Sequence, residues 1–204
     1  MSVIPINLAT EDELSEAVLR RLLAFVRRGY EVGHAYRRGG FGYLRRTVRG
    51  WNGAARGVPF LVLTDLDNLP CPKAFIDSWL TEPQHGNLIF RVAVREVEAW
   101  LLADARSLSR YLVVSENLIP SNAESLEDPK GALINLARRS RSAIVRDRIV
   151  PKRGSSAKQG PDYNGCLVQF VATHWDIGSA VAKSRSLRRT TNRLAKFRPI
   201  WTQI

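Results

Sequence analysis

The chain has 204 residues, of which 45% are hydrophobic and 25% charged, with 14 glycines, 10 prolines and two cysteines. This length and composition exclude two large domains and the collagenous, disordered and disulfide-scaffold classes. The formal net charge of +12 favours a polyanionic partner. The N-terminal residues show neither a signal peptide nor a spanning helix, so we expect a cytoplasmic protein with no membrane contact.

The positive charge is unevenly distributed along the chain. Residues 1–19, 20–59, 60–137 and 138–204 carry net charges of −4, +9, −5 and +12. Arginine outnumbers lysine 25 to 6, and guanidinium groups favour bidentate contacts with phosphate or carboxylate. Codon bias of a GC-rich genome would explain arginine over lysine, but not the excess of base over acid. We therefore expect contact with a phosphate backbone.

The first half of the chain alternates between expected strands and helices. Apolar runs predict strands, in chain order, at Val3–Thr10, Tyr30–Tyr36, Val58–Asp65 and Asn87–Val94. Amphipathic spacing predicts a helix after each of the first three strands, and a fourth helix begins near Arg95. The continuous apolar run Val58–Asp65 is typical of a parallel strand buried on both faces. We expect an α/β domain over residues 1–104, a Rossmann-like core with a mostly parallel sheet and its ligand site at the carboxyl ends of the strands.

The second half, residues 105–204, is expected to be largely helical and basic and to pack on this core. Apolar residues recur there at three- or four-residue spacing, including a continuous helical pattern through residues 129–145. The segment Val150–Asp162 is rich in Gly, Ser, Pro and Lys and is predicted to be an exposed loop.

Acidic residues follow two of the predicted strands. Asp65 and Asp67 end the most apolar strand, and Glu11 follows the first strand. In an extended strand end, side chains at i and i+2 point the same way, so the two aspartates can share a hard cation such as Mg²⁺. A solvated turn is the competing explanation for an Asp-x-Asp pair. Because parallel strands end at one edge of a sheet, Glu11 is expected to lie beside the aspartates.

The order of these acids resembles the TOPRIM domain of topoisomerases, bacterial primases and OLD-family nucleases. The shared pattern is a glutamate after the first strand (Glu11), an acid in the next helix (Glu16) and an Asp-x-Asp pair after a later strand (Asp65 and Asp67). The chain is more closely similar to small stand-alone TOPRIM proteins encoded beside ATPase genes in bacterial defence loci. The residues that carry this likeness are the glycine turn Gly39–Gly42, the segment Val62–Asp67 and above all REVEAWLLAD, Arg95–Asp104. In one departure, Asp12 stands where TOPRIM sequences usually have glycine after the first glutamate.

The resemblance implies a Mg²⁺-dependent site for phosphodiester chemistry, in which Mn²⁺ can substitute. Glu11 would be a general acid/base or metal ligand, with Asp65 and Asp67 as ligands. Glu98 is expected to point from its helix toward the strand ends and to join the site. Arg95 would either stabilise transition-state charge or pair with Glu98 within the helix.

Several features have a structural as well as a functional explanation. Glu96 and Asp104 are expected on the helix surface, and Asp12 and Glu13 at the start of a helix. The aromatic rings of Tyr36, Phe41 and Tyr43 would either stack on unpaired bases or pack against the fold. The basic residues expected to contact nucleic acid flank the glycine turn or lie in the second half: Arg37, Arg38, Arg45, Arg46, Lys130, Arg188 and Arg189.

Two functional classes follow. The first is a Mg²⁺-dependent nuclease acting on DNA or RNA in anti-phage defence with an ATPase partner. The second is a non-catalytic subunit that binds nucleic acid or an ATPase and has a degenerate TOPRIM site. Both are compatible with a homo-oligomer. The acids decide between the classes, because only the nuclease requires them to bind metal.

Overall fold

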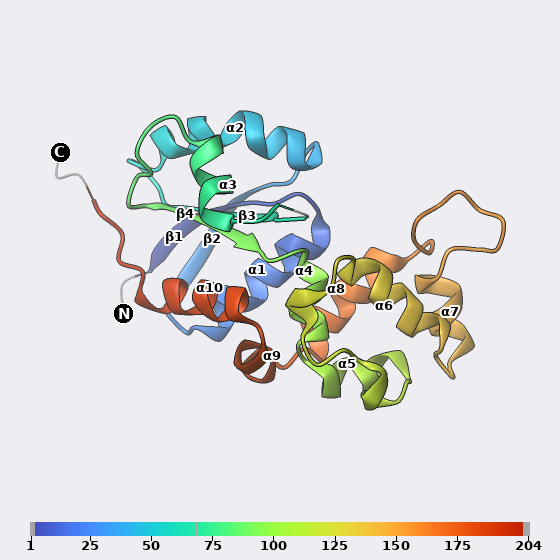
Figure 1. Cartoon of the computed structure of the whole chain (residues 1–204). Helices are drawn as coiled ribbons and strands as arrows, with labels where there is room; N and C mark the ends of the chain where they lie inside the picture. Colours follow the sequence, from blue (N-terminus) through green and yellow to red (C-terminus); the bar gives the residue numbers. More distant parts are fainter. Residues whose placement is uncertain (1–2, 68, 202–204) are drawn as a thin grey trace.

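A parallel β-sheet forms the centre of the molecule. A computed structural model describes residues 3–67 and 69–201. The four strands are β1 (Ile4–Ala9), β2 (Tyr30–Tyr36), β3 (Phe60–Asp65) and β4 (Leu88–Ala93), and their order is β2-β1-β3-β4 with every pair parallel. The α/β class with a parallel sheet is therefore confirmed, and β4 lies at one edge (Figure 1).

Helices cover both faces of this sheet. The helices α2 (Gly40–Ala54) and α3 (Pro72–Trp79) lie on one face, and α1 (Glu13–Phe25) and α10 (Arg185–Lys196) lie on the other (Figure 1). Alternate side chains of β3 lie on opposite faces of the sheet, because successive side chains of a strand point in opposite directions. Val62 belongs to the core beneath α2 and α3, whereas Leu61 and Leu63 belong to the core on the side of α1.

The chain beyond the sheet is helical. Its helices are α4 (Val97–Leu102), α5 (Ala105–Leu112), α6 (Pro129–Arg138), α7 (Ala143–Ile149), α8 (Tyr163–Thr173), α9 (Ile177–Lys183) and then α10, with short 3-10 turns at Glu116–Leu118 and Ala123–Ser125. Most of these helices lie beyond the carboxyl ends of the strands (Figure 1). Leu108, Leu133, Phe170 and Leu187 share one hydrophobic core with β1 and α1, so the two halves pack together. None of the described helices is long and apolar enough to cross a membrane.

The continuous helical pattern expected over residues 129–145 is wrong, because the chain breaks it into α6 and α7. The amide of Ser142 donates to the Ser140 hydroxyl, and the Ser142 hydroxyl accepts from the amide of Val145. Serine side chains that bond the backbone in this way favour turns and helix starts over helix interiors. Apolar periodicity alone does not register this competition.

Asp104 is not on the helix surface, as the sequence suggested, but is 1% exposed. One carboxylate oxygen accepts from the amide of Ser107 at 3.2 Å and caps α5, and the other accepts from the amide of Asp176 at 2.8 Å. This single side chain therefore ties α4 and α5 to the start of α9.

Replacing Asp104 with alanine is expected to lower the free energy of unfolding by about 3 kcal/mol, because the cap of α5 and the hydrogen bond from the amide of Asp176 are both lost from a buried side chain. Urea denaturation at pH 7 measures the change. Asp147→Ala, at an exposed position of α7, is the matched control and is expected to stay within about 0.5 kcal/mol of the parent. Equal stabilities of the two variants would contradict the structural role of Asp104.

Candidate metal and nucleic-acid site

Glu11 and Asp65 meet where β1 and β3 end. Glu11 Oε1 accepts a hydrogen bond from the amide of Asp65 at 3.1 Å and another from the Thr64 hydroxyl. Asp12, the next residue, accepts from the amide of Ser15 at 2.8 Å and caps α1. Glu11 is thus the N-terminal acid that reaches the neighbouring strand, and Asp12 starts the helix.

The loops after β3 and β4 are fastened to each other. The amide of Asp67 donates to the carbonyl of Arg95 at 2.9 Å, and the Arg95 guanidinium donates to the carbonyl of Asp67 at 3.3 Å. Both residues adopt left-handed backbone, with φ of +50° at Asp67 and +66° at Arg95, which is unfavourable for residues other than glycine. The surrounding bonds hold this strained pair of loops in place.

This geometry corrects two expectations. The chain leaves the extended conformation at Asp67, so strand alternation does not orient Asp65 and Asp67 alike: Asp65 is half-buried and bonds the amide of Val97 at 3.0 Å, whereas Asp67 is exposed. Arg95 precedes α4, so the intrahelical pair with Glu98 is not the arrangement found. The guanidinium instead joins the two loops beside the acids.

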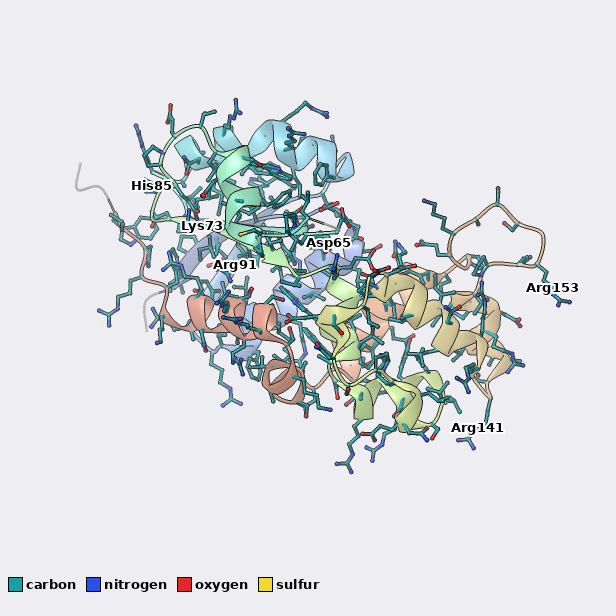
Figure 2. All side chains as sticks on the ribbon, viewed as in Figure 1. Asp65, Lys73, His85, Arg91, Arg141 and Arg153 are labelled. Atoms are coloured by element: carbon teal, nitrogen blue, oxygen red, sulfur yellow. The ribbon has the colours of Figure 1, made fainter. Side chains whose placement is uncertain are left out.

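Two further acids enter from the start of α4. Glu98 is 6% exposed and accepts from the Tyr163 hydroxyl of α8 at 2.9 Å. Glu96 accepts from the amide of Lys130, in the first turn of α6, at 2.8 Å, so its expected surface position is wrong. The Lys130 ammonium lies 5.0 Å from the centre of the Tyr163 ring. The helical half therefore contributes directly to this edge of the sheet (Figure 2).

Burial and mutual repulsion raise the pKa values of these acids. Burial is the main cause for Glu11, Asp65, Glu96 and Glu98, and the pKa of Glu98 rises to about 7. Neighbouring negative charges raise these pKa values further. Glu98 and Glu11 raise the pKa of Asp65, and Asp67 raises the pKa of Glu11. A cluster of this kind is short of positive charge, and a bound cation would favour the ionised forms.

The donor chemistry of this cluster fits a hard divalent cation. Among the described residues, Glu11 accepts hydrogen bonds through Oε1 and Asp65 accepts one through Oδ1. The second oxygen of each carboxylate is therefore available to bind a cation, and the exposed Asp67 can supply a third carboxylate. Oxygen donors of this type suit Mg²⁺. Across residues 3–67 and 69–201, no three His, Cys, Asp or Glu side chains are already grouped closely enough to hold an ion. The residues thus supply the donors but not a preassembled site.

The glycine turn begins α2 and presents arginines to solvent. Gly39 and Gly40 have φ of +84° and +58°, and the helix starts at Gly40. Arg37 lies 3.3 Å from Glu16 and 3.9 Å from Glu13, which ties the turn to α1. Arg38, Arg45 and Arg46 are exposed.

The aromatic residues of this region pack against the fold. Phe41 meets Trp79 edge-on at 5.1 Å, and Tyr43 and Tyr36 each lie 5.7 Å from Trp51 between ring centres. These contacts favour the structural explanation over base stacking, since each ring already has an aromatic partner.

Sequence reasoning missed a basic cleft along the edge strand β4. Arg91, Arg185 and the predicted Arg189 line it together with Lys73, whereas Arg188 is exposed elsewhere on α10. A signal was available in β4, where Arg91 interrupts the apolar series of Ile89 and Ala93 at an alternate position.

Comparisons with known proteins add no assignment: no protein-family model, curated protein or solved structure matches this chain.

Proposed function

We propose that this protein is a Mg²⁺-dependent, TOPRIM-type nuclease that hydrolyses phosphodiester bonds in DNA or RNA. The observation that carries the proposal is the gathering of Glu11, Asp65, Asp67, Glu96 and Glu98 at one edge of the sheet, with raised pKa values for four of them. Repulsion among buried carboxylates destabilises a fold unless something compensates for it. A divalent cation would compensate for it and is also what phosphodiester hydrolysis commonly uses.

The proposed roles follow from exposure and hydrogen bonding. Glu11, Asp65 and Asp67 would hold the ion, which when bound supplies electrophilic stabilisation of the phosphate and a more acidic water. Alternatively, Glu11 would leave the ion to Asp65 and Asp67 and accept the proton of the attacking water, because burial raises the pKa of its carboxyl. As the new P–O bond forms, the bond to the leaving oxygen of the sugar breaks.

Positive charge flanks these acids. Lys130 lies close enough to Glu96 and Glu98 to lower the pKa of both, against the larger effect of burial, and Arg95 is fixed between the loops. Both cations are candidates to stabilise the extra negative charge of the phosphorane-like transition state. Glu98, held by Tyr163, would position the start of α4 and thereby Asp65, rather than touch the substrate.

An ATPase partner and a role in anti-phage defence are further parts of the proposal and rest on the family resemblance. A cytoplasmic location is proposed from the cysteine content, since two cysteines give no disulfide framework. The competing candidate is a non-catalytic subunit that binds nucleic acid or the ATPase. One observation favours that candidate: the carboxylates are not grouped as a ready metal site in the described part of the chain.

Cleavage of end-labelled single-stranded and duplex DNA and of tRNA, with Mg²⁺, Mn²⁺ or EDTA, tests the proposal. We expect metal-dependent shortening of at least one substrate, by the chain alone or together with an ATPase partner of the kind that the resemblance implies. Binding without cleavage in all of these conditions would favour the non-catalytic subunit.

Nucleic-acid binding is expected to weaken steeply with salt, because each arginine–phosphate contact releases a condensed counterion. Arg45→Gln and Arg46→Gln are each expected to lower the slope of log K against log salt by roughly 1. Fluorescence anisotropy with EDTA present, over a salt series, measures both effects. A slope unchanged by these substitutions would show that α2 does not contact the phosphates.

A further inference from the structure

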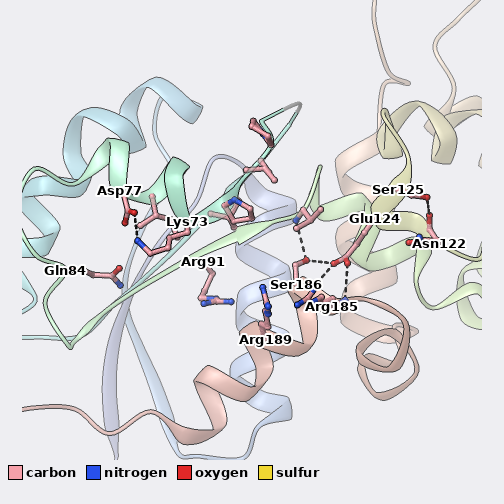
Figure 3. Close-up of a pocket in the computed structure, with 16 residues that line it drawn as sticks. Lys73, Asp77, Gln84, Arg91, Asn122, Glu124, Ser125, Arg185, Ser186 and Arg189 are labelled. Atoms are coloured by element: carbon pink, nitrogen blue, oxygen red, sulfur yellow. Dashed lines mark hydrogen bonds and ion pairs between the residues drawn. The ribbon is translucent and has the colours of Figure 1, made fainter.

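A cleft follows the free edge of β4. It has a volume of about 970 Å³ and lies between α3 and α10 (Figure 3). The α3 side carries the apolar residues Leu66, Pro72 and Ile76 beside the Lys73–Asp77 ion pair, and the other side carries Arg185 and Arg189 of α10 together with Glu124. The cleft therefore combines apolar surface on one side with an excess of basic residues on the other.

Arg91 forms the floor of this cleft and occupies an unusual position. Its neighbours Ile89 and Ala93, on the same face of β4, are buried in the core, and Arg91 is itself half-buried. Its Nε donates to the Thr190 hydroxyl of α10 at 3.2 Å, and Figure 3 shows its guanidinium beside that of Arg189. Burial, together with the charges of Arg193 and Arg189, lowers the pKa of Arg91.

These guanidinium groups are not paired with the two carboxylates that also line the cleft, Asp77 and Glu124. Among the described residues, no acidic side chain forms an ion pair with Arg91, Arg185 or Arg189. The nearby Glu124 is already committed: it accepts from the Ser184 hydroxyl and from the amide and hydroxyl of Ser186, as well as from the amide of Arg185. Glu124 thus fixes the start of α10. With Asp77 it offsets part of the positive charge, so that Lys73, Arg91, Arg185 and Arg189 still leave the lining with an excess of base over acid.

A purely structural explanation accounts for only part of this arrangement. An inward-pointing charge on an edge strand prevents pairing with another sheet, and Arg91 alone would serve that purpose. Arg189 and Arg193 of α10 place further positive charge near Arg91, where they lower its pKa and do not block the edge any better. Their convergence is better explained by an anionic ligand that removes the repulsion when it binds.

We propose that the β4-edge cleft binds a single-stranded segment of nucleic acid, with its phosphates on Arg91, Arg185 and Arg189 and its bases against the apolar surface on the α3 side. This inference rests on the proposed function, for which it supplies the path of the substrate. Guanidinium groups bind phosphate oxygens strongly, and unpaired bases lie on apolar surfaces. A volume of about 970 Å³ has room for a short single strand, whereas a duplex would reach only the rim.

The cleft also leads to the acids. Its lining includes Leu66, which lies between Asp65 and Asp67, and Val94, which directly precedes Arg95. A strand lying along β4 toward its carboxyl end would therefore bring a phosphate to the cluster of carboxylates. The basic cleft would supply affinity and the acidic edge the chemistry.

The test is binding of fluorescein-labelled oligothymidylate by anisotropy, in EDTA so that cleavage plays no part. Arg91→Gln combined with Arg189→Gln is compared with Arg139→Gln combined with Arg141→Gln, an exposed pair that removes the same charge (Figure 2 shows Arg141 at the far end of the helical half). Arg189→Gln alone, at an exposed position, keeps the test valid if the cleft double variant folds poorly.

We expect the cleft variant to weaken binding at least about tenfold and to reduce the salt slope by roughly 1.4, and the control to change affinity less than about threefold. Equal losses in both variants, tighter binding of a matched duplex, or a mononucleotide that competes better than the oligomer would each overturn the cleft assignment. Cleavage with normal binding by the cleft variant would overturn this inference alone. Cleft-dependent binding without any cleavage would overturn only the nuclease.

Discussion

Replacing Asp67 with alanine is expected to lower Mg²⁺-dependent cleavage by at least about a hundredfold while leaving affinity for nucleic acid unchanged or higher. Asp67 is exposed and contributes its backbone, not its side chain, to the contact with Arg95, so the fold should tolerate the change. Its carboxylate would hold the ion needed for the chemical step. In the absence of metal the same charge repels the substrate phosphate, and its removal relieves that repulsion.

Single-turnover cleavage and anisotropy, measured on the same preparations, separate these two effects. Asp65→Asn is the second variant, because asparagine can still accept from the amide of Val97 but carries no charge. Asp147→Ala serves as the surface control. Full activity in both site variants, within an assembly that cleaves, would mean that these acids are structural and that the nuclease site lies elsewhere.

The pH dependence of stability is expected to reflect the buried acids. In the folded protein the pKa of Glu98 is raised from 4.5 to about 7. Between these values the folded state binds more protons than the unfolded state, so stability falls as the pH rises from about 4.5 through about 7. The difference in pKa corresponds to a loss of about 3 kcal/mol above pH 7. Glu11, Asp65 and Glu96 shift in the same direction.

Urea denaturation at pH 5 and pH 8 measures this loss, and Glu98→Gln is the matched variant, since its amide oxygen can still accept from Tyr163. Relative to the parent, the variant is expected to be more stable at pH 8 than at pH 5 by about 2.5 kcal/mol, because a small part of the parent's loss has already occurred at pH 5. If the free energy of unfolding of parent and variant changed in parallel with pH, the pKa of Glu98 would not be raised in the folded protein.

The strands β3 and β4 were predictable because their apolar runs are local and continuous. The predicted Val58–Asp65 and Asn87–Val94 exceed β3 and β4 by one or two residues at an end. The meeting of Glu11 with Asp65 follows from the same reasoning, because neighbouring parallel strands end at one edge. Local pattern therefore accounts for the framework and for the first two acids of the site.

The missed features depend on partners far along the chain. Asp104 accepts a hydrogen bond from the amide of Asp176, and Glu96 accepts one from the amide of Lys130. No local sequence pattern predicts either contact. The left-handed backbone of Asp67 follows from the bonds between two loops. The basic cleft required knowing that β4 is an edge strand beside α10, which the order of elements in sequence does not state.

Titration of Mg²⁺ into the isolated chain by isothermal calorimetry tests the central claim, that the acids at the carboxyl edge form a metal site. Repeating it near pH 6.5 in buffers of different ionisation enthalpy also counts protons released from carboxyls with raised pKa values. We predict saturable binding with proton release, lost or weakened at least about tenfold in Asp67→Ala. The absence of saturable binding at millimolar Mg²⁺, or identical isotherms for parent and Asp67→Ala, would contradict the claim.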